Sequence, residues 1–167
     1  MPDFDLLFRG APAGVIEYQG RWLRRAFDVS VSSGDRLDVF FERFTSRPVQ
    51  GLGISLDDPR GALAIAGTTA RSFALWTDSA PPHVACSILR VKAGGRLTVI
   101  NQWRDEKYGT TLYAINAAAI DVRSQSDASA ILHCSDGWGM EPNFGNLVVR
   151  LVLHRATEPR RDSEAAI

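Results

Sequence analysis

The chain has 167 residues, 45% hydrophobic and 23% charged, with 19 basic and 19 acidic side chains. These values are typical of a single globular domain and exclude a disordered or fibrous chain. The formal net charge of zero lacks the basic excess that displaces counterions from phosphate, so we expect no nucleic-acid partner.

Alternation of apolar and polar side chains is the dominant pattern, and it predicts β-strands along most of the chain. A short helix around residues 22–27 is a less favoured alternative to a strand there. The predicted strands, in chain order, lie near residues 5–8, 23–31, 36–43, 50–55, 62–66, 71–76, 84–91, 96–103, 110–122 (one strand or two), 128–134 and 147–154.

Turn-forming residues separate these strands, and Ala93-Gly94-Gly95 predicts a hairpin between two of them. Many short strands joined by turns are typical of an antiparallel β-sandwich, of jelly-roll or lectin-like type, with a closed barrel as the alternative. We expect one all-β domain over residues 1–155. Residues 156–167, which are charged and nearly devoid of apolar side chains, predict a disordered tail.

The N-terminal residues resemble no secretory signal, and no apolar stretch approaches the ~20 residues that cross a bilayer. We therefore expect a soluble, cytoplasmic protein without a membrane partner.

Cys86 and Cys134 each alternate in phase with apolar neighbours, which predicts buried, reduced thiols. A disulfide would require the two strands to be neighbours, and a nucleophile would require a nearby base and some exposure.

The basic side chains are almost all arginine, since only Lys92 and Lys107 are lysine. Codon bias in a GC-rich genome explains this composition, and so does bidentate binding of planar anions by guanidinium groups. The sequence leaves both explanations open.

Signatures of phosphate loops, zinc sites and nucleophile elbows are absent from the sequence. His83, His133 and His154 are not spaced as metal ligands along a helix or strand. The alternation places His133 and His154 on the polar face of their strands, as surface or rim residues.

The least ordinary segment is residues 135–146, which joins two predicted strands and is too long for a tight hairpin. Its side-chain oxygens and aromatic rings suit a Ca²⁺ ion or a sugar, and loops on rigid β-scaffolds often carry binding groups. A purely structural loop, with Trp138 and Phe144 capping the core, is the alternative. The candidate ligand-binding residues here are Asp136, Trp138, Glu141, Asn143 and Asn146.

Residues 135–151 resemble the calcium loop and last strand of the small bacterial fucose- and mannose-binding lectins, which are β-sandwiches. Asp136-Gly137 matches the opening of that loop, and residues 147–151 match the strand. The resemblance implies sugar binding through calcium held by Asp136, Glu141, Asn143 and Asn146. The chain departs from the pattern in two asparagines that replace aspartates, in Gly145, which replaces an asparagine, in a longer loop and in continuing past the strand.

A second cluster covers residues 102–108, where four successive charged residues interrupt two strands. It suits a solvated hairpin tip. Alternatively, Trp103 and Tyr108 supply stacking surfaces for a ligand at a polar rim that includes Arg104. A third possibility is that Arg104 stacks on an aromatic ring. Trp76, in an apolar run, is expected in the core.

Three functions are compatible with these patterns. The first is a non-catalytic binding module for a carbohydrate or another small polar ligand. The second is a structural or protein-interaction role as a homo-oligomer. The third is a small β-barrel enzyme that uses acid–base chemistry and therefore requires a deep pocket; its candidate residues are Asp105, Tyr113, His133, Asp136 and Glu141. We rank them in this order.

Overall fold

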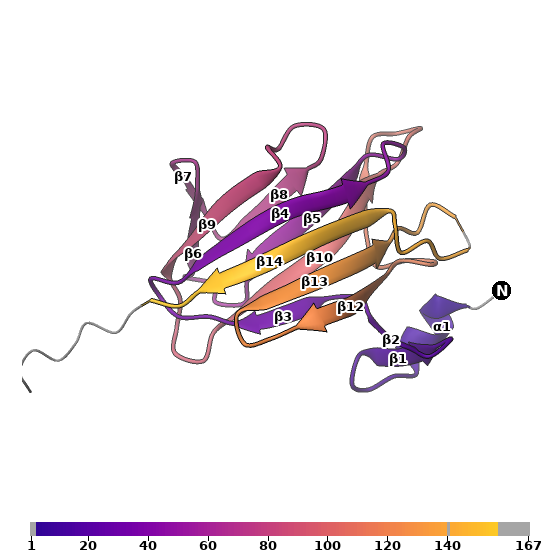
Figure 1. Cartoon of the computed structure of the whole chain (residues 1–167), viewed down its shortest axis with the longest axis horizontal. Coiled ribbons are helices and arrows are strands. Elements are labelled where there is room, and N and C mark those ends of the chain that lie inside the picture. Colours follow the sequence, from indigo (N-terminus) through magenta and orange to yellow (C-terminus); the bar gives the residue numbers. More distant parts are fainter. Residues whose placement is uncertain (1–2, 140, 157–167) are drawn as a thin grey trace, which may run out of the picture.

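The computed structural model describes residues 3–139 and 141–156, and they form two antiparallel sheets packed face to face (Figure 1). The predicted all-β sandwich is confirmed, and the closed-barrel alternative is wrong because the sheets remain separate. The larger sheet has the strand order β1 (Val15–Tyr18), β2 (Arg21–Arg24), β12 (Ala119–Gln125), β13 (Ser129–Ser135), β14 (Leu147–His154), β4 (Arg36–Phe44), β9 (His83–Arg90), β6 (Ala62–Ile65), β7 (Thr68–Ala70).

The smaller sheet lies behind the larger one in Figure 1. Its order is β11 (Thr111–Leu112), β10 (Arg96–Arg104), β5 (Gln50–Leu56), β8 (Ser72–Trp76), and β3 (Phe27–Ser30) also pairs with β10. The main hydrophobic core fills the space between the two sheets. It is built from the alternate side chains that the period-two pattern predicts.

Strand β9 shows this alternation clearly, because Val84, Cys86 and Ile88 are buried in the core. Cys134 is likewise buried on β13, and both thiols are free. The prediction of buried, reduced cysteines is therefore confirmed. No disulfide forms because strands β14 and β4 stand between β13 and β9.

Several connections cross between the sheets, and the sequence patterns did not predict these crossings. The predicted strand 23–31 is divided between β2, in the larger sheet, and β3, in the smaller one. The hairpin predicted at residues 93–95 is wrong, because the strands that it joins, β9 and β10, belong to different sheets. A turn motif specifies a reversal of the backbone but not the sheet that the next strand enters.

The predicted strand at residues 5–8 is wrong, because this segment forms helix α1 (Phe4–Arg9). The Asp3 side chain accepts a hydrogen bond from the backbone N–H of Leu6 at 3.0 Å and caps the helix. Phe4 and Phe8 lie one turn apart, with ring centroids 6.2 Å apart in an edge contact. The cap and this spacing favour a helix over the strand that the apolar run predicts.

The segment 110–122 contains two strands, β11 and β12, separated by residues 113–118. Strands β1 and β7 were not predicted, because they are too short for the alternation to stand out. No helix in the described ranges is long and apolar enough to cross a membrane.

A second, smaller apolar cluster lies on the outer face of the larger sheet, at the end formed by β1, β2 and β12. Ile120 points into the main core, so its neighbours Ala119 and Asp121 point outward. Ala119 packs there with residues of α1 and of the β1–β2 hairpin. The buried members are Phe4, Ile16, Leu23 and Ala119, and the partly buried ones are Phe8, Ala11, Tyr18 and Phe144. Helix α1 and the hairpin therefore form a raised edge beside β12.

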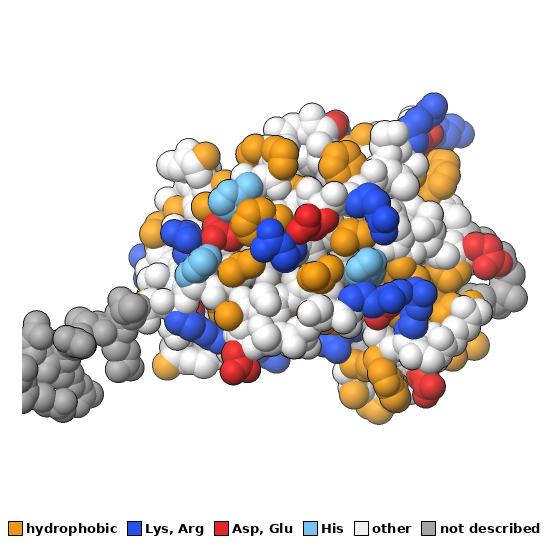
Figure 2. Space-filling view, in the orientation of Figure 1, with side chains coloured by type: hydrophobic (Ala, Val, Ile, Leu, Met, Phe, Trp, Pro, Cys, Tyr) orange, Lys and Arg blue, Asp and Glu red, His pale blue; other side chains and the backbone are white. Residues whose placement is uncertain are grey.

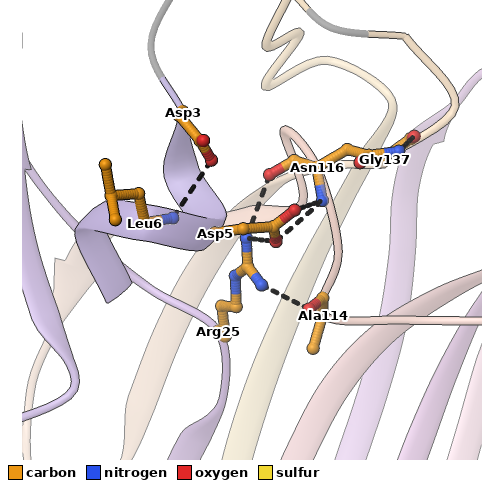
Figure 3. A network of polar contacts seen from close by, with 7 residues as sticks. All are labelled: Asp3, Asp5, Leu6, Arg25, Ala114, Asn116 and Gly137. Carbon is orange, nitrogen blue, oxygen red and sulfur yellow. Dashed lines mark hydrogen bonds and ion pairs between the residues drawn. The ribbon is translucent and has the colours of Figure 1, made fainter. Parts of the chain in front are cut away.

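A polar network anchors α1 to two loops (Figure 3). Arg25 pairs with Asp5 at 2.8 Å and donates to the carbonyl oxygens of Ala114 and Asn116. The Asn116 backbone N–H donates to Asp5, and its side chain donates to the Gly137 carbonyl at 3.0 Å. The network thus holds the loop at residues 136–146 against the N-terminal segment.

Most of the predicted tail, residues 157–167, lies outside the described residues, as does Met140. Ala156 is described, and its backbone N–H donates to Asp35 at 2.7 Å. Arg155 also pairs with Asp35 at 3.3 Å. The chain is therefore held to the sandwich as far as Ala156.

Candidate functional site

The loop that joins β13 to β14 begins with a buried carboxylate. Asp136 accepts hydrogen bonds from the Gln50 side chain at 2.7 Å and from the Trp138 backbone N–H at 3.1 Å. Burial raises the pKa of Asp136, and these two hydrogen bonds offset part of that effect. Asp136 therefore connects the start of the loop to Gln50 of β5 and to the backbone at Trp138.

The asparagines of this loop also bind its own backbone. The Asn143 side-chain oxygen accepts from the Gly145 N–H at 2.9 Å, and that of Asn146 accepts from the Asp136 N–H at 3.1 Å. These are the turn-stabilising bonds that Asn and Asp side chains commonly make. The loop thus has its own internal support.

The predicted calcium ligands do not fit a calcium ion. Ca²⁺ is bound by 6–8 oxygens, mostly carboxylate or carbonyl. Here the side-chain oxygens of Asp136, Asn143 and Asn146 accept hydrogen bonds from within the protein. Glu141 is exposed. The described residues also contain no group of three or more His, Cys, Asp or Glu side chains arranged to hold a metal.

The two halves of the loop differ in their surroundings. The Trp138 side chain is 53% exposed, so it does not cap the core as the structural alternative required. Phe144 packs against the small apolar cluster on the outer face. Residues 142–145 also form one wall of a cleft on this face.

We call this cleft the outer cleft; its volume is about 460 Å³. The β1–β2 turn and the loop form its walls, and the larger sheet forms its base. The lining residues are Tyr18, Gln19 and Arg21 from the turn region, Arg43, Arg123 and His133 from the sheet, and Pro142, Asn143, Phe144 and Gly145 from the loop.

Strand register explains why residues distant in sequence meet here. Asp121 on β12 pairs with His133 on β13, His133 pairs with Val148 on β14, and Val148 pairs with Arg43 on β4. Directly opposed residues project from the same face of a sheet, and neighbouring strands lie about 4.8 Å apart. The four side chains therefore form a row across the outer face. This confirms that His133 lies on the polar face of its strand.

Asp121 positions the two arginines at one side of the cleft. It is buried, its Oδ2 accepts from Arg123 Nε at 2.5 Å, and Arg21 Nη1 lies 3.7 Å away. The Arg21 guanidinium also stacks over the Phe144 ring, 5.0 Å from its centroid. These contacts hold both guanidinium groups at the cleft wall.

His133 lies in a positive environment. Partial burial lowers its pKa, and the charges of Arg123 and Arg43 lower it further, whereas Asp121 acts in the opposite direction. The neutral imidazole is therefore favoured at neutral pH. Figure 2 shows Lys and Arg side chains gathered beside a histidine over the β13 end of this face.

The cluster at residues 102–108 does not form a ligand site of the predicted kind. Trp103 is fully buried beneath Gly137, so its ring offers no stacking surface. Arg104 stacks over Trp76 at 4.3 Å and pairs with Asp78 at 2.8 Å, as the third alternative for this cluster anticipated. Trp76 is partly buried at this contact.

The candidate acid–base residues occupy different places. His133 lines the outer cleft, and Asp136 is buried beneath the loop. Asp105 accepts from the Tyr108 backbone N–H at 2.9 Å within a turn, and the side chains of Tyr113 and Glu141 are exposed. The structure thus brings none of the other four candidates to the cleft that His133 lines.

A second polar cluster lies further along the same face. Asp38, on β4, accepts from His154 at 2.7 Å and from His83 at 3.1 Å, and Arg36 lies 3.3 Å away. Burial tends to raise the pKa of Asp38, but the two histidine hydrogen bonds and Arg36 together hold it below its usual value. This cluster joins three adjacent strands, β9, β4 and β14.

Sequence reasoning missed the arginines of the outer cleft and the residues of the β1–β2 turn. The excess of arginine over lysine was the available signal, but it did not indicate which arginines meet. Comparison with models of protein families, with curated proteins and with solved structures found no match to this chain. The fold and the cleft define it as a β-sandwich with a polar cleft on one outer face.

Proposed function

We propose that this chain is a non-catalytic binding module for a small polar ligand of about the size of a sugar, bound in the outer cleft. The observation that carries the proposal is the cleft itself, which unites the predicted loop with polar side chains from four strands. Its volume of about 460 Å³ falls in the range of small-molecule sites.

The chemistry of the walls supports a polar ligand. The rings of Tyr18 and Phe144 provide apolar surface, and His133, Gln19 and Asn143 provide hydrogen-bonding groups. Asp121 and the small apolar cluster support these walls from beneath. Binding therefore requires little reorganisation of the site.

A glycan array probed with the whole protein, with and without a calcium chelator, tests this function. We expect binding that the chelator leaves unchanged, because the loop residues do not fit calcium. Hits should be lost in His133→Ala and retained in His83→Ala, which removes a histidine of the same outer face away from the cleft. Equal binding by both variants would contradict the outer cleft as the site.

Self-association is a second candidate function, favoured by exposed apolar side chains near the same end of the sandwich. Tyr113, Ile115 and Trp138 are 56%, 39% and 53% exposed, and the Asn116–Gly137 hydrogen bond holds their segments together. Size-exclusion chromatography with light scattering tests this function. A concentration-dependent dimer that Trp138→Ser weakens would support it, and a monomer at every concentration would contradict it.

A further inference from the structure

The outer cleft carries an excess of positive charge. Arg21, Arg43 and Arg123 line it, and none of the described residues that line it is acidic. The carboxylate of Asp121 lies beneath and offsets one of the three charges. Two positive charges remain on the described residues of the site, leaving His133 aside, although the whole chain has no net charge.

The arginines differ in how they are held. Arg123 uses its Nε to bind Asp121, and this leaves its terminal N–H groups free to reach a ligand. The Arg43 side chain forms no ion pair or hydrogen bond with the described part of the chain. Strand register places Arg43 two strands away from His133, on the opposite side from Asp121. The two arginines thus flank the histidine.

This arrangement suits an oxyanion. Guanidinium groups bind carboxylate and phosphate oxygens bidentately, and a preorganised fork loses little side-chain entropy on binding. Resting on the proposed binding function, we infer that the ligand of the outer cleft is anionic, a sugar-sized molecule that carries a carboxylate or a phosphate. Arg43 and Arg123 bind its charged group, and His133 lies between them.

A neighbouring cleft of about 530 Å³ lies on the other side of Arg21 and Arg123 and is lined by Arg24 and Trp22. It shares Arg21 and Arg123 with the outer cleft but not Arg43 or His133. Asp121 lines it together with Arg21, Arg24 and Arg123, so arginine charges are in excess there as well. Arg43→Gln and Arg24→Gln therefore distinguish the two clefts.

The test is calorimetric titration of the whole protein with four probes: glucose, glucuronate, glucose 6-phosphate and inorganic phosphate. We expect glucuronate and glucose 6-phosphate to bind at least about tenfold more tightly than glucose, and added salt to weaken both. Arg43→Gln and Arg123→Gln should each weaken their binding about tenfold, and Arg24→Gln should not. In NMR spectra the pKa of His133 should rise when the anion binds, because a nearby negative charge favours the imidazolium form.

Two results separate this inference from the proposed function. If glucose binds as well as the charged sugars and the arginine variants are unaffected, the anionic inference is overturned and the binding module stands. If inorganic phosphate binds as tightly as glucose 6-phosphate, the oxyanion site is supported and the sugar-sized ligand is contradicted.

Two other results also overturn the inference. The first is loss of binding in Arg24→Gln but not in Arg43→Gln, which assigns the anion to the neighbouring cleft. The second is the absence of binding by any of the four probes to a protein that a thermal melt shows to be folded. The glycan array still tests the proposed function in that case.

Discussion

Arg25 and Asp5 form an ion pair in which Nη2 lies 2.8 Å from Oδ1, and this contact joins the start of the chain to the corner between the two sheets. The same guanidinium binds the carbonyl oxygens of Ala114 and Asn116 and stacks over the Phe8 ring at 4.6 Å. One side chain thus ties helix α1 to the loop between β11 and β12.

Arg25→Ala should lower the free energy of unfolding by about 2–3 kcal/mol, because it leaves two carbonyl oxygens without the guanidinium donor and removes the ion pair with Asp5, which keeps only the Asn116 N–H. Urea unfolding followed by circular dichroism measures the loss. Arg47→Ala is the control, since that arginine is 82% exposed and pairs only with Glu106 in the described residues. We expect the control to change stability by less than about 1 kcal/mol. Equal effects of the two variants would contradict the role assigned to Arg25.

The Asp38 cluster predicts a dependence of stability on pH. The pKa of Asp38 in the folded protein is below the ordinary value of 3.8, so its charged form stabilises the fold. This contribution is fully present above the ordinary pKa and is lost as the pH falls through the lowered one.

Asp38→Asn should therefore lower the free energy of unfolding at pH 7 by about 1–3 kcal/mol and reduce the loss of stability between about pH 5 and pH 2. Denaturant titrations at several pH values measure both effects. Asp127→Asn, at an exposed turn residue, is the matched control. If the free energy of unfolding falls as steeply with decreasing pH in Asp38→Asn as in the unmodified protein, this carboxylate is not the source of the acid sensitivity.

Gly137 lies where no side chain fits. A Cβ added there would meet the Ile115 carbonyl and lie 2.7 Å from the Trp103 ring. Gly137→Ala should therefore lower stability by about 1–3 kcal/mol. Gly139→Ala is the control, because its nearest neighbouring atoms would lie 3.9 Å from the new Cβ. Thermal melts of both variants test this prediction, which fails if the two melt together.

Both thiols should be unreactive while the protein is folded. Cys86 and Cys134 are fully buried, and burial raises the pKa of Cys86 to about 12 and that of Cys134 as well. Ellman's reagent at pH 8 should label neither residue in native buffer and both in guanidinium chloride. Cys86→Ser assigns the signals, because it should leave one reactive thiol after unfolding. Rapid labelling of the native protein would contradict the burial of these residues.

The alternation of side chains predicted the sandwich and most of its strands because one face of each strand must pack on the core. It also predicted the outward direction of His133 and the burial of Cys86 and Cys134. These properties depend only on neighbours along one strand, which a single sequence displays.

The pairing of strands and the residues of the cleft could not be predicted in this way. Arg43 and His133 line the same cleft because both pair with Val148 of β14, one from each side. They are 90 positions apart in the sequence, and no local pattern links β4 to β13. Alternation gives the face of a strand but not its neighbours. For the same reason the sequence offers Trp103, at the end of an alternating run, as a stacking surface for a ligand, although the loop at Gly137 covers it.

Strand β14 lies in the middle of the larger sheet, between β13 and β4 (Figure 1). During synthesis, a nascent chain that ends before residue 147 therefore holds two half-sheets whose facing edges have no partner. Unpaired edges are templates for aggregation. Completion of the larger sheet must therefore wait until residues 147–154 have been synthesised, and until then the edges of β13 and β4 that β14 later covers leave the emerging chain prone to aggregation.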